Sequence, residues 1–94
     1  MSATIWKYQL LQTDYQVVFM PDGAAPLHVG LQDDHWMVWA MVDPNAHPEP
    51  RYIAVVGTGH PIPDGTGSYL GTIQQPPFVW HLFEMREMVV ERES

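Results

Sequence analysis

The 94-residue chain contains no cysteine, which excludes a disulfide framework and any zinc site built on thiolates. It also lacks an apolar run approaching the ~18 residues that a membrane-spanning helix needs. Its first residues show no charged segment followed by an apolar one, as a secretion signal would. We therefore expect a cytoplasmic protein with no membrane partner.

Positive charge is equally scarce. Lysine and arginine together number 4 against 11 acidic residues, for a net charge of −7. Nucleic acids and anionic membranes are bound by basic surfaces, so direct binding of nucleic acid is not expected. The charge instead suits a protein partner with a basic surface. Mimicry of DNA is a weaker alternative, because most of the acidic residues are scattered along the chain.

Helical periodicity is almost absent, and short alternating or β-branched runs take its place. Turn residues such as Pro21-Asp22-Gly23 and Asp33-Asp34 separate these runs. The run His35–Val42 is apolar on both faces, which is typical of a central or an interface strand. Gly71 interrupts another run and predicts a bulge or a close approach. Strands are expected at Trp6–Leu10, Tyr15–Phe19, Leu27–Leu31, His35–Val42, Arg51–Val56, Tyr69–Gln74 and Phe78–Phe83.

This pattern predicts one all-β domain over residues 1–94, either a small antiparallel sandwich or a partly open barrel of about seven short strands. The segment Asp43–Pro50 is expected to be a polar loop. Residues 84–94 mix helix-favouring Glu, Met and Arg with Val89-Val90, which favours a strand. A short C-terminal helical turn and a strand extension are both open, with a frayed acidic tail from about residue 86 to 94.

The segment Gly57–Gly65, GTGHPIPDG, holds three glycines, two prolines and a histidine directly after an apolar run. Proline lacks a backbone donor and glycine is conformationally loose, so the segment predicts a shaped loop between two strands. Gly57 and Gly59 allow positive φ, and Asp64-Gly65 is expected to close a turn. A rigid structural connector is one interpretation. Because shaped loops often carry function, the predicted binding residues include Gly57, Thr58, Gly59, His60, Pro61, Pro63 and Asp64.

Large apolar side chains exceed what one thin sheet face needs. They include Trp36, Trp80 and Phe78, and most of them are expected in the core. An exposed remainder on a small protein marks an interface. We predict that Trp39 and Met41 belong to such a binding surface on the His35–Val42 strand. Homodimerisation through this strand or its neighbour is a further hypothesis.

Motifs for catalysis and metal binding are missing. The five histidines form neither an H-x-H nor an HExxH pattern. The GTG tripeptide is not followed by the lysine of a phosphate-binding loop. A small hydrolase-like enzyme centred on His60, Asp64 and His81 is an alternative. Against it stands a simpler interpretation, with a turn histidine at His60 and an inward, hydrogen-bonded His81. No catalytic residue, metal or cofactor is predicted.

The chain resembles a family of small uncharacterised proteins found in bacteriophages and prophages. The GTGHPIP heptapeptide at Gly57–Pro63 is the most specific match, and the others are Ile5–Tyr8, Met20–Ala24, Trp39–Pro44, Tyr69–Thr72 and His81–Glu84. The resemblance implies a compact β-rich domain, a phage or prophage context and a cytosolic setting. It brings no catalytic residues with it.

Together these features predict a non-enzymatic phage or prophage accessory protein that binds a host component in the host cytoplasm. Counter-defence is the expected role, either by blocking a defence protein such as a CRISPR effector or by sequestering a small nucleotide signal. A blocker needs an apolar patch with an acidic rim, whereas sequestration needs an aromatic pocket with phosphate donors. The shortage of cations favours the blocker. A minor virion component is a third hypothesis.

Overall fold

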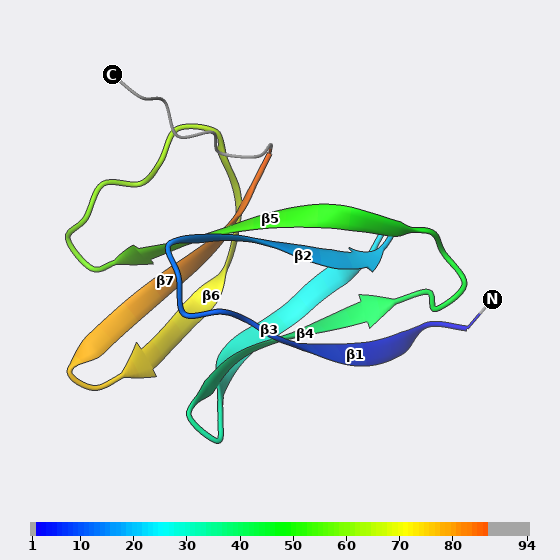
Figure 1. Ribbon diagram of the computed structural model, residues 1–94, viewed down its shortest axis with the longest axis horizontal. Coiled ribbons are helices and arrows are strands. Elements are labelled where there is room, and N and C mark those ends of the chain that lie inside the picture. Colours follow the sequence, from blue (N-terminus) through cyan, green and yellow to red (C-terminus); the bar gives the residue numbers. More distant parts are fainter. Residues whose placement is uncertain (1, 87–94) are drawn as a thin grey trace.

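The computed structural model describes residues 2–86, in which seven strands and no helix occur (Figure 1). All strand pairs are antiparallel, which confirms the predicted all-β class. Within the described residues, no helix is long and apolar enough to cross a membrane. The strands are β1 (Thr4–Gln9), β2 (Tyr15–Pro21), β3 (Ala25–Gln32), β4 (His35–Val42), β5 (Pro48–Gly57), β6 (Thr66–Gln75) and β7 (Phe78–Met85).

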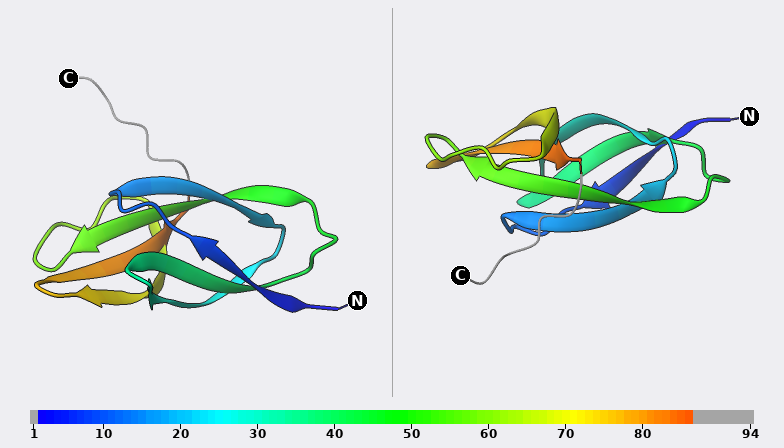
Figure 2. Two further views of the ribbon diagram at one scale, coloured as in Figure 1. Left: turned by 60° about the horizontal axis from the view of Figure 1, so that its bottom comes forward. Right: turned by 90° about the horizontal axis from the view of Figure 1, so that it is seen from above.

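The strands form a three-stranded sheet in the order β1-β4-β3 and a four-stranded sheet in the order β2-β5-β7-β6. The molecule measures 44 × 33 × 18 Å along its principal axes. The β5–β6 loop lies at one end of the long axis and the start of β1 at the other (Figure 2). The two sheets form the expected small sandwich, with β3 and β6 in close contact.

The core lies between the inner faces of the two sheets, as strand alternation requires. On β4, Trp36, Val38, Ala40 and Val42 are buried in it. They pack with buried side chains of the other sheet, among them Ile53, Val55, Ile73 and Leu82. Because β4 pairs with both β1 and β3, the run His35–Val42 is a central strand, as its two-sided apolar pattern predicts.

Gly71 is both a bulge and a close-approach point. The register of β6 against β7 shifts between Tyr69 and Gly71. Gly71 has a φ of +149°, and a Cβ built on it would lie 2.5 Å from Cγ2 of Val29 on β3. Such a contact is far below the 3.5–4.0 Å of ordinary carbon contacts. Glycine therefore lets β6 pass directly against the other sheet.

The β3–β4 hairpin closes through Asp33 and Asp34, with φ values of +52° and +64°. Positive φ at both central residues is the mark of a type I′ turn, whose twist matches that of the flanking strands. The predicted Pro21-Asp22-Gly23 turn is also present, with the Ala24 N–H donating to the Pro21 carbonyl at 3.0 Å. Both turns were predictable from residue types alone.

Most strands begin or end a few residues from the predicted positions, and β6 begins at Thr66 instead of Tyr69. Two differences bear on predicted loops and ends. The expected loop 43–50 is wrong for residues 48–50, which begin β5. Residues 48–50 pair only with β2, because β7 pairs with β5 from Tyr52 onward. Proline is tolerated there because the unpaired side of the strand needs no backbone N–H donor. At the other end β7 continues to Met85, a strand extension. The helical-turn alternative and the frayed tail otherwise fall on residues 87–94, outside the described residues.

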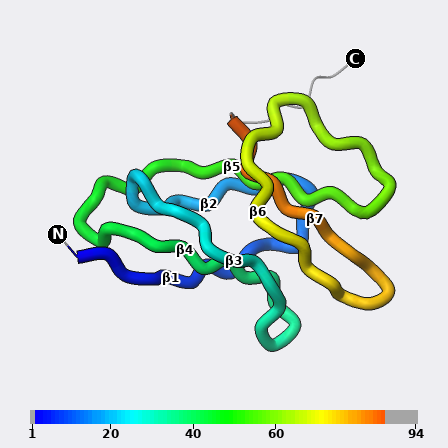
Figure 3. Tube along the Cα trace, turned by 180° about the vertical axis from the view of Figure 1, so that it is seen from behind, coloured from blue at the N-terminus to red at the C-terminus, as the bar shows by residue number. Residues whose placement is uncertain are grey.

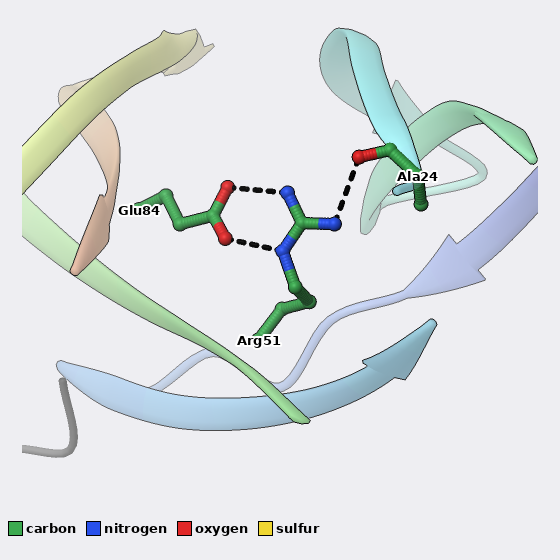
Figure 4. Close-up of polar contacts among 3 residues, drawn as sticks. All are labelled: Ala24, Arg51 and Glu84. Atoms are coloured by element: carbon green, nitrogen blue, oxygen red, sulfur yellow. Dashed lines mark hydrogen bonds and ion pairs between the residues drawn. The ribbon is translucent and has the colours of Figure 1, made fainter. Parts of the chain in front are cut away.

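An ion pair stabilises one end of the sandwich (Figure 4). Arg51 on β5 donates through Nε and Nη2 to the two carboxylate oxygens of Glu84 on β7, with Nη2 2.8 Å from Oε1. Its Nη1 donates to the carbonyl of Ala24 at 2.8 Å, in the connection from β2 to β3. The hydrogen bond to Glu84 raises the pKa of Arg51 above its usual value. Arg51 thus joins the four-stranded sheet to the chain entering the other sheet.

Candidate functional site

The predicted binding residues fall into two separate groups. Trp39 and Met41 face outward on the three-stranded sheet, and Met41 pairs with Ile5 near the start of β1. The loop containing Gly57–Asp64 connects β5 to β6, at the opposite end of the molecule (Figures 1 and 2). The two groups therefore do not form one site.

The loop has a defined shape. The His60 N–H donates to the Gly57 carbonyl at 3.0 Å, and the Thr66 hydroxyl donates to the Pro63 carbonyl at 2.5 Å. Gly59 has a φ of +89°, which glycine allows, and Gly65 has a φ of +79° in the turn expected at Asp64-Gly65.

Gly57 does not use the positive φ that glycine allows, because it continues β5. Its lack of a side chain leaves room for two neighbouring rings. A Cβ there would lie 3.4 Å from Nδ1 of His60 and 3.5 Å from the Trp80 ring, so both rings lie beside the bare backbone.

Two adjoining hollows lie between this loop, the β1–β2 connection and the β6–β7 hairpin. Figure 3 shows the loop and this hairpin at the same end of the molecule. The hollows have volumes of about 440 and 340 Å³ and share Asp14, Val55 and Trp80. We call them together the aromatic groove. The larger is also lined by Gln12, Thr13, Trp36, Gln75, Pro76 and Phe78, and the smaller by Tyr15, Val56, Gly57, His60, Pro61 and Pro63.

The aromatic rings of the groove are held in place by hydrogen bonds and stacking. The indole N–H groups of Trp36 and Trp80 both donate to Oε1 of Gln75, each at 3.2 Å. Phe78 stacks on Trp80 with ring centroids 5.4 Å apart and an interplanar angle of 22°. Because both N–H groups are bonded and Trp36 is buried, a ligand would mainly meet the exposed Phe78 ring and the part of Trp80 beside it. The faces of such rings are electron-rich and attract cations.

The rim of the groove is acidic. Asp14 lines both hollows, and the side chain of Gln12 donates to the Asp34 carbonyl at 3.3 Å, which places the Asp33-Asp34 turn next to the rim. Among the residues that the structure describes, no lysine or arginine lines either hollow. Lys7 instead bonds Gln32 and Arg51 bonds Glu84. In the described part of the chain, Asp14 is thus the acidic lining residue, and no lysine or arginine beside it offsets its charge.

A third hollow of about 280 Å³ brings His60 and His81 together under the loop. His81 Nε2 lies 2.7 Å from the Thr58 hydroxyl and Nδ1 lies 3.0 Å from the Thr72 hydroxyl. His81 is hydrogen-bonded as predicted, but its predicted inward position is wrong. It pairs with Val56 and Thr72 on the outer face of the sheet.

The geometry gives the three-residue hydrolase hypothesis little support. Both ring nitrogens of His81 bond hydroxyls, and Asp64 does not line the hollow that holds His60 and His81. Within residues 2–86, no group of three or more His, Cys, Asp and Glu side chains is placed to hold a metal ion.

Comparison with known proteins gives one match. A family model described as a domain of unknown function, DUF7352, matches residues 1–93. The chain belongs to the DUF7352 family. No curated protein and no solved structure matches it. The match extends over every strand and over the Gly57–Gly65 loop, so the aromatic groove lies within the DUF7352 domain.

Part of the groove in this DUF7352 protein was predictable from the sequence. The predicted binding residues His60, Pro61 and Pro63 line it, and Trp80 and Phe78 belong to the large apolar side chains noted in the sequence. Asp14 and Gln75 were not predicted as site residues. No local signal identifies them, because they reach the groove only through strand pairing and the indole bonds of two distant tryptophans.

Proposed function

We propose that this DUF7352 protein is a non-enzymatic accessory protein of a phage or prophage that binds a host protein in the host cytoplasm and opposes host defence. A defence protein with a basic surface, such as a CRISPR effector, is the type of target. The phage context rests on the resemblance carried by segments such as GTGHPIP. The binding role rests on the aromatic groove.

The observation that carries the proposal is the combination of stacked aromatic faces with an acidic rim. An arginine or lysine over the face of Trp80 or Phe78 gains about 0.5–2 kcal/mol, depending on how far it is desolvated. Each exposed carboxylate on the rim, such as that of Asp14, adds about 0.2–1 kcal/mol and attracts a basic partner from a distance. The groove is thus complementary to a basic protein segment.

Sequestration of a nucleotide signal is the less favoured form of this role. An anionic phosphate needs cations or converging N–H donors. The described lining of the groove offers Asp14 and no lysine or arginine. A nucleotide base would stack on Trp80, but its phosphate would meet a carboxylate.

Affinity capture from a host lysate tests the proposal. Tagged wild type is compared with Phe78→Ala, which removes an aromatic face, and Asp14→Lys, which reverses the rim charge. Leu27→Ala is the matched control, because Leu27 and Phe78 are each 54% exposed and Leu27 lies on the other sheet. Mass spectrometry identifies captured proteins and small molecules.

We expect wild type and Leu27→Ala to retain the same basic host protein, and Phe78→Ala and Asp14→Lys to lose it. Capture should weaken as salt rises from about 50 to 300 mM, because the rim charge is screened. A captured defence protein is then tested by plaque formation: wild type should restore growth of a targeted phage and Asp14→Lys should not. The proposal would be contradicted if Asp14→Lys captured the same protein as well as wild type does, or if wild type co-purified with a nucleotide and no host protein.

A further inference from the structure

The outer face of the four-stranded sheet has apolar side chains on all four of its strands, together with the polar Thr72, Gln74 and His81. Tyr15, Val17 and Phe19 of β2 alternate with residues that face the core. Register places Val17 opposite Tyr52 of β5 and Ala54 opposite Phe83 of β7, and Phe83 in turn opposite Tyr69 of β6. Directly opposed residues share a face, so these side chains form one surface. We call it the uncharged face.

No Asp, Glu, Lys or Arg lies on this face among the described strand residues. The outward positions are every second residue of 15–19 on β2, 50–56 on β5 and 79–85 on β7, with 69, 72 and 74 on β6. The face of an antiparallel sheet that contacts solvent ordinarily carries polar and charged side chains. Here Phe19 is 61% exposed and Tyr69 58% exposed. Ala54, Val56 and Met85 on the same face are buried, so the exposed apolar area is concentrated at Tyr15, Val17, Phe19 and Tyr69. Clustered exposed apolar side chains mark an interface.

The outer face of the other sheet differs. It has Lys7 donating to Gln32 at 2.7 Å, and Gln9 bonded to His35 at 3.3 Å, across the strands of that sheet. The described aspartates lie in turns and loops, at 14, 22, 33, 34, 43 and 64. The uncharged face is therefore a specific property of the β2-β5-β7-β6 sheet in a chain with a net charge of −7.

We infer that a second copy of this chain packs on the uncharged face and forms a two-fold symmetric dimer. Two chains of charge −7 repel each other at long range, so they can meet only where no carboxylate is buried without a partner. A two-fold interface presents the same patch from both sides. An uncharged apolar face meets that condition without any opposed like charges. A basic partner would gain no electrostatic attraction here, unlike at the aromatic groove.

The size of the face favours a weak dimer. Four strands about 4.8 Å apart, presenting about five to seven residues each with a rise of about 3.4 Å, give a flat footprint of roughly 19 × 20 Å. That is smaller than the about 800 Å² per partner of a standard interface. Interfaces of this size are ordinarily weak and transient, so the dimer should form only at high protein concentration.

The inference is independent of the proposed function. The aromatic groove shares only Tyr15 and Val56 with the uncharged face, while Asp14, Phe78 and Trp80 lie outside it. A dimer can thus leave most of the groove open. A variant that no longer dimerises but still captures the host protein separates the two proposals, and so does one that dimerises but no longer captures it.

Sedimentation velocity between about 1 and 500 µM tests the dimer. Phe19→Asp places a charge on the uncharged face, and Ile5→Asp is its matched control. Phe19 and Ile5 are 61% and 58% exposed, and each lies on a strand at the edge of its sheet. Val17→Lys is a second variant on the same face, with circular dichroism as the check on folding. We expect wild type and Ile5→Asp to reach twice the monomer mass and Phe19→Asp and Val17→Lys to stay monomeric.

Salt distinguishes this dimer from an ionic one. Raising sodium chloride from about 50 to 500 mM screens the repulsion between like-charged copies and should strengthen the association several-fold. A wild type that stays monomeric at the highest concentration would overturn the inference. So would dimerisation of folded Phe19→Asp at the wild-type concentration, loss of the dimer in Ile5→Asp alone, or a dimer that dissociates as salt rises.

Discussion

Replacing Gly71 by alanine tests the close packing of the two sheets. The added methyl group would lie 2.5 Å from Cγ2 of Val29, on a backbone with a φ of +149°. Val29 is 2% exposed and belongs to the core, so it has little room to move. Over-packing of a tight core costs about 1–3 kcal/mol, and a φ that only glycine adopts readily costs about 1–3 kcal/mol.

We expect Gly71→Ala to lower the free energy of unfolding by about 3 kcal/mol, a large share of the total of about 5–15 kcal/mol. For a domain of this size that corresponds to a fall in Tm of about 12–24 °C. Urea denaturation followed by tryptophan fluorescence measures the first quantity, and calorimetry measures the second.

Two further variants separate the clash from the backbone strain. Gly23 has a φ of +79° and no atom within 4 Å of its added Cβ, so Gly23→Ala should cost only about 1–2 kcal/mol. In a Val29→Ala background the clashing methyl group is gone, and Gly71→Ala should cost about 1–2 kcal/mol less than in wild type. The reasoning is refuted if Gly71→Ala costs no more than Gly23→Ala, or if its cost is the same in both backgrounds.

The remaining predictions concern three polar features. Arg51→Met should cost about 2–3 kcal/mol in urea denaturation, because it leaves the half-buried Glu84 carboxylate unpaired, and a second change, Glu84→Leu, should recover part of that cost. The Tyr8 hydroxyl is buried and has no hydrogen-bond partner in the part of the chain that is described, so Tyr8→Phe should leave the protein unchanged or about 1 kcal/mol more stable at pH 7. Burial raises the pKa of Tyr8, because the folded state favours the neutral phenol over the ionised one. This pH-dependent stabilisation is fully present below the unfolded pKa of about 10 and is lost as pH rises through the folded-state pKa. Thermal unfolding at high pH should therefore show a steeper loss of stability for wild type than for Tyr8→Phe. Asp34→Gly should raise stability by about 0.5–1 kcal/mol, since glycine suits the positive φ of 64°, and an unchanged Tm would argue against strain in this turn.

Local pattern was enough to predict seven strands near the observed positions, but it did not decide which face of each strand enters the core. On β2 the apolar set Tyr15, Val17 and Phe19 is exposed. The alternation in His35–Val42 separates Trp36 and Val38 from Met37 and Trp39, and the structure buries the first pair in the core. Gly71 was predictable as a bulge because a lone glycine inside a strand has few other uses. These successes come from interactions between near neighbours in the chain.

The sheet order and the groove depend on contacts between distant residues. β1 pairs with β4, and β5 pairs with β7, although other strands lie between them in the sequence. That order decides that Asp14 and Gln75 meet Trp80, and that Trp39 and Met41 lie away from the loop. The uncharged face was likewise hidden, because its residues lie on four separate strands and only their register brings them together.

The most direct test of the central claim, that the aromatic groove binds a basic protein segment, is a nuclear magnetic resonance titration of the ¹⁵N-labelled protein with a short arginine-rich peptide. The account predicts amide shifts concentrated at residues 12–14, 57–63 and 75–80, with little change when a glutamate-rich peptide is used instead. Shifts spread evenly over all the aspartate-bearing turns would show that the peptide follows net charge alone. That result, or shifts centred outside the groove, would contradict the account.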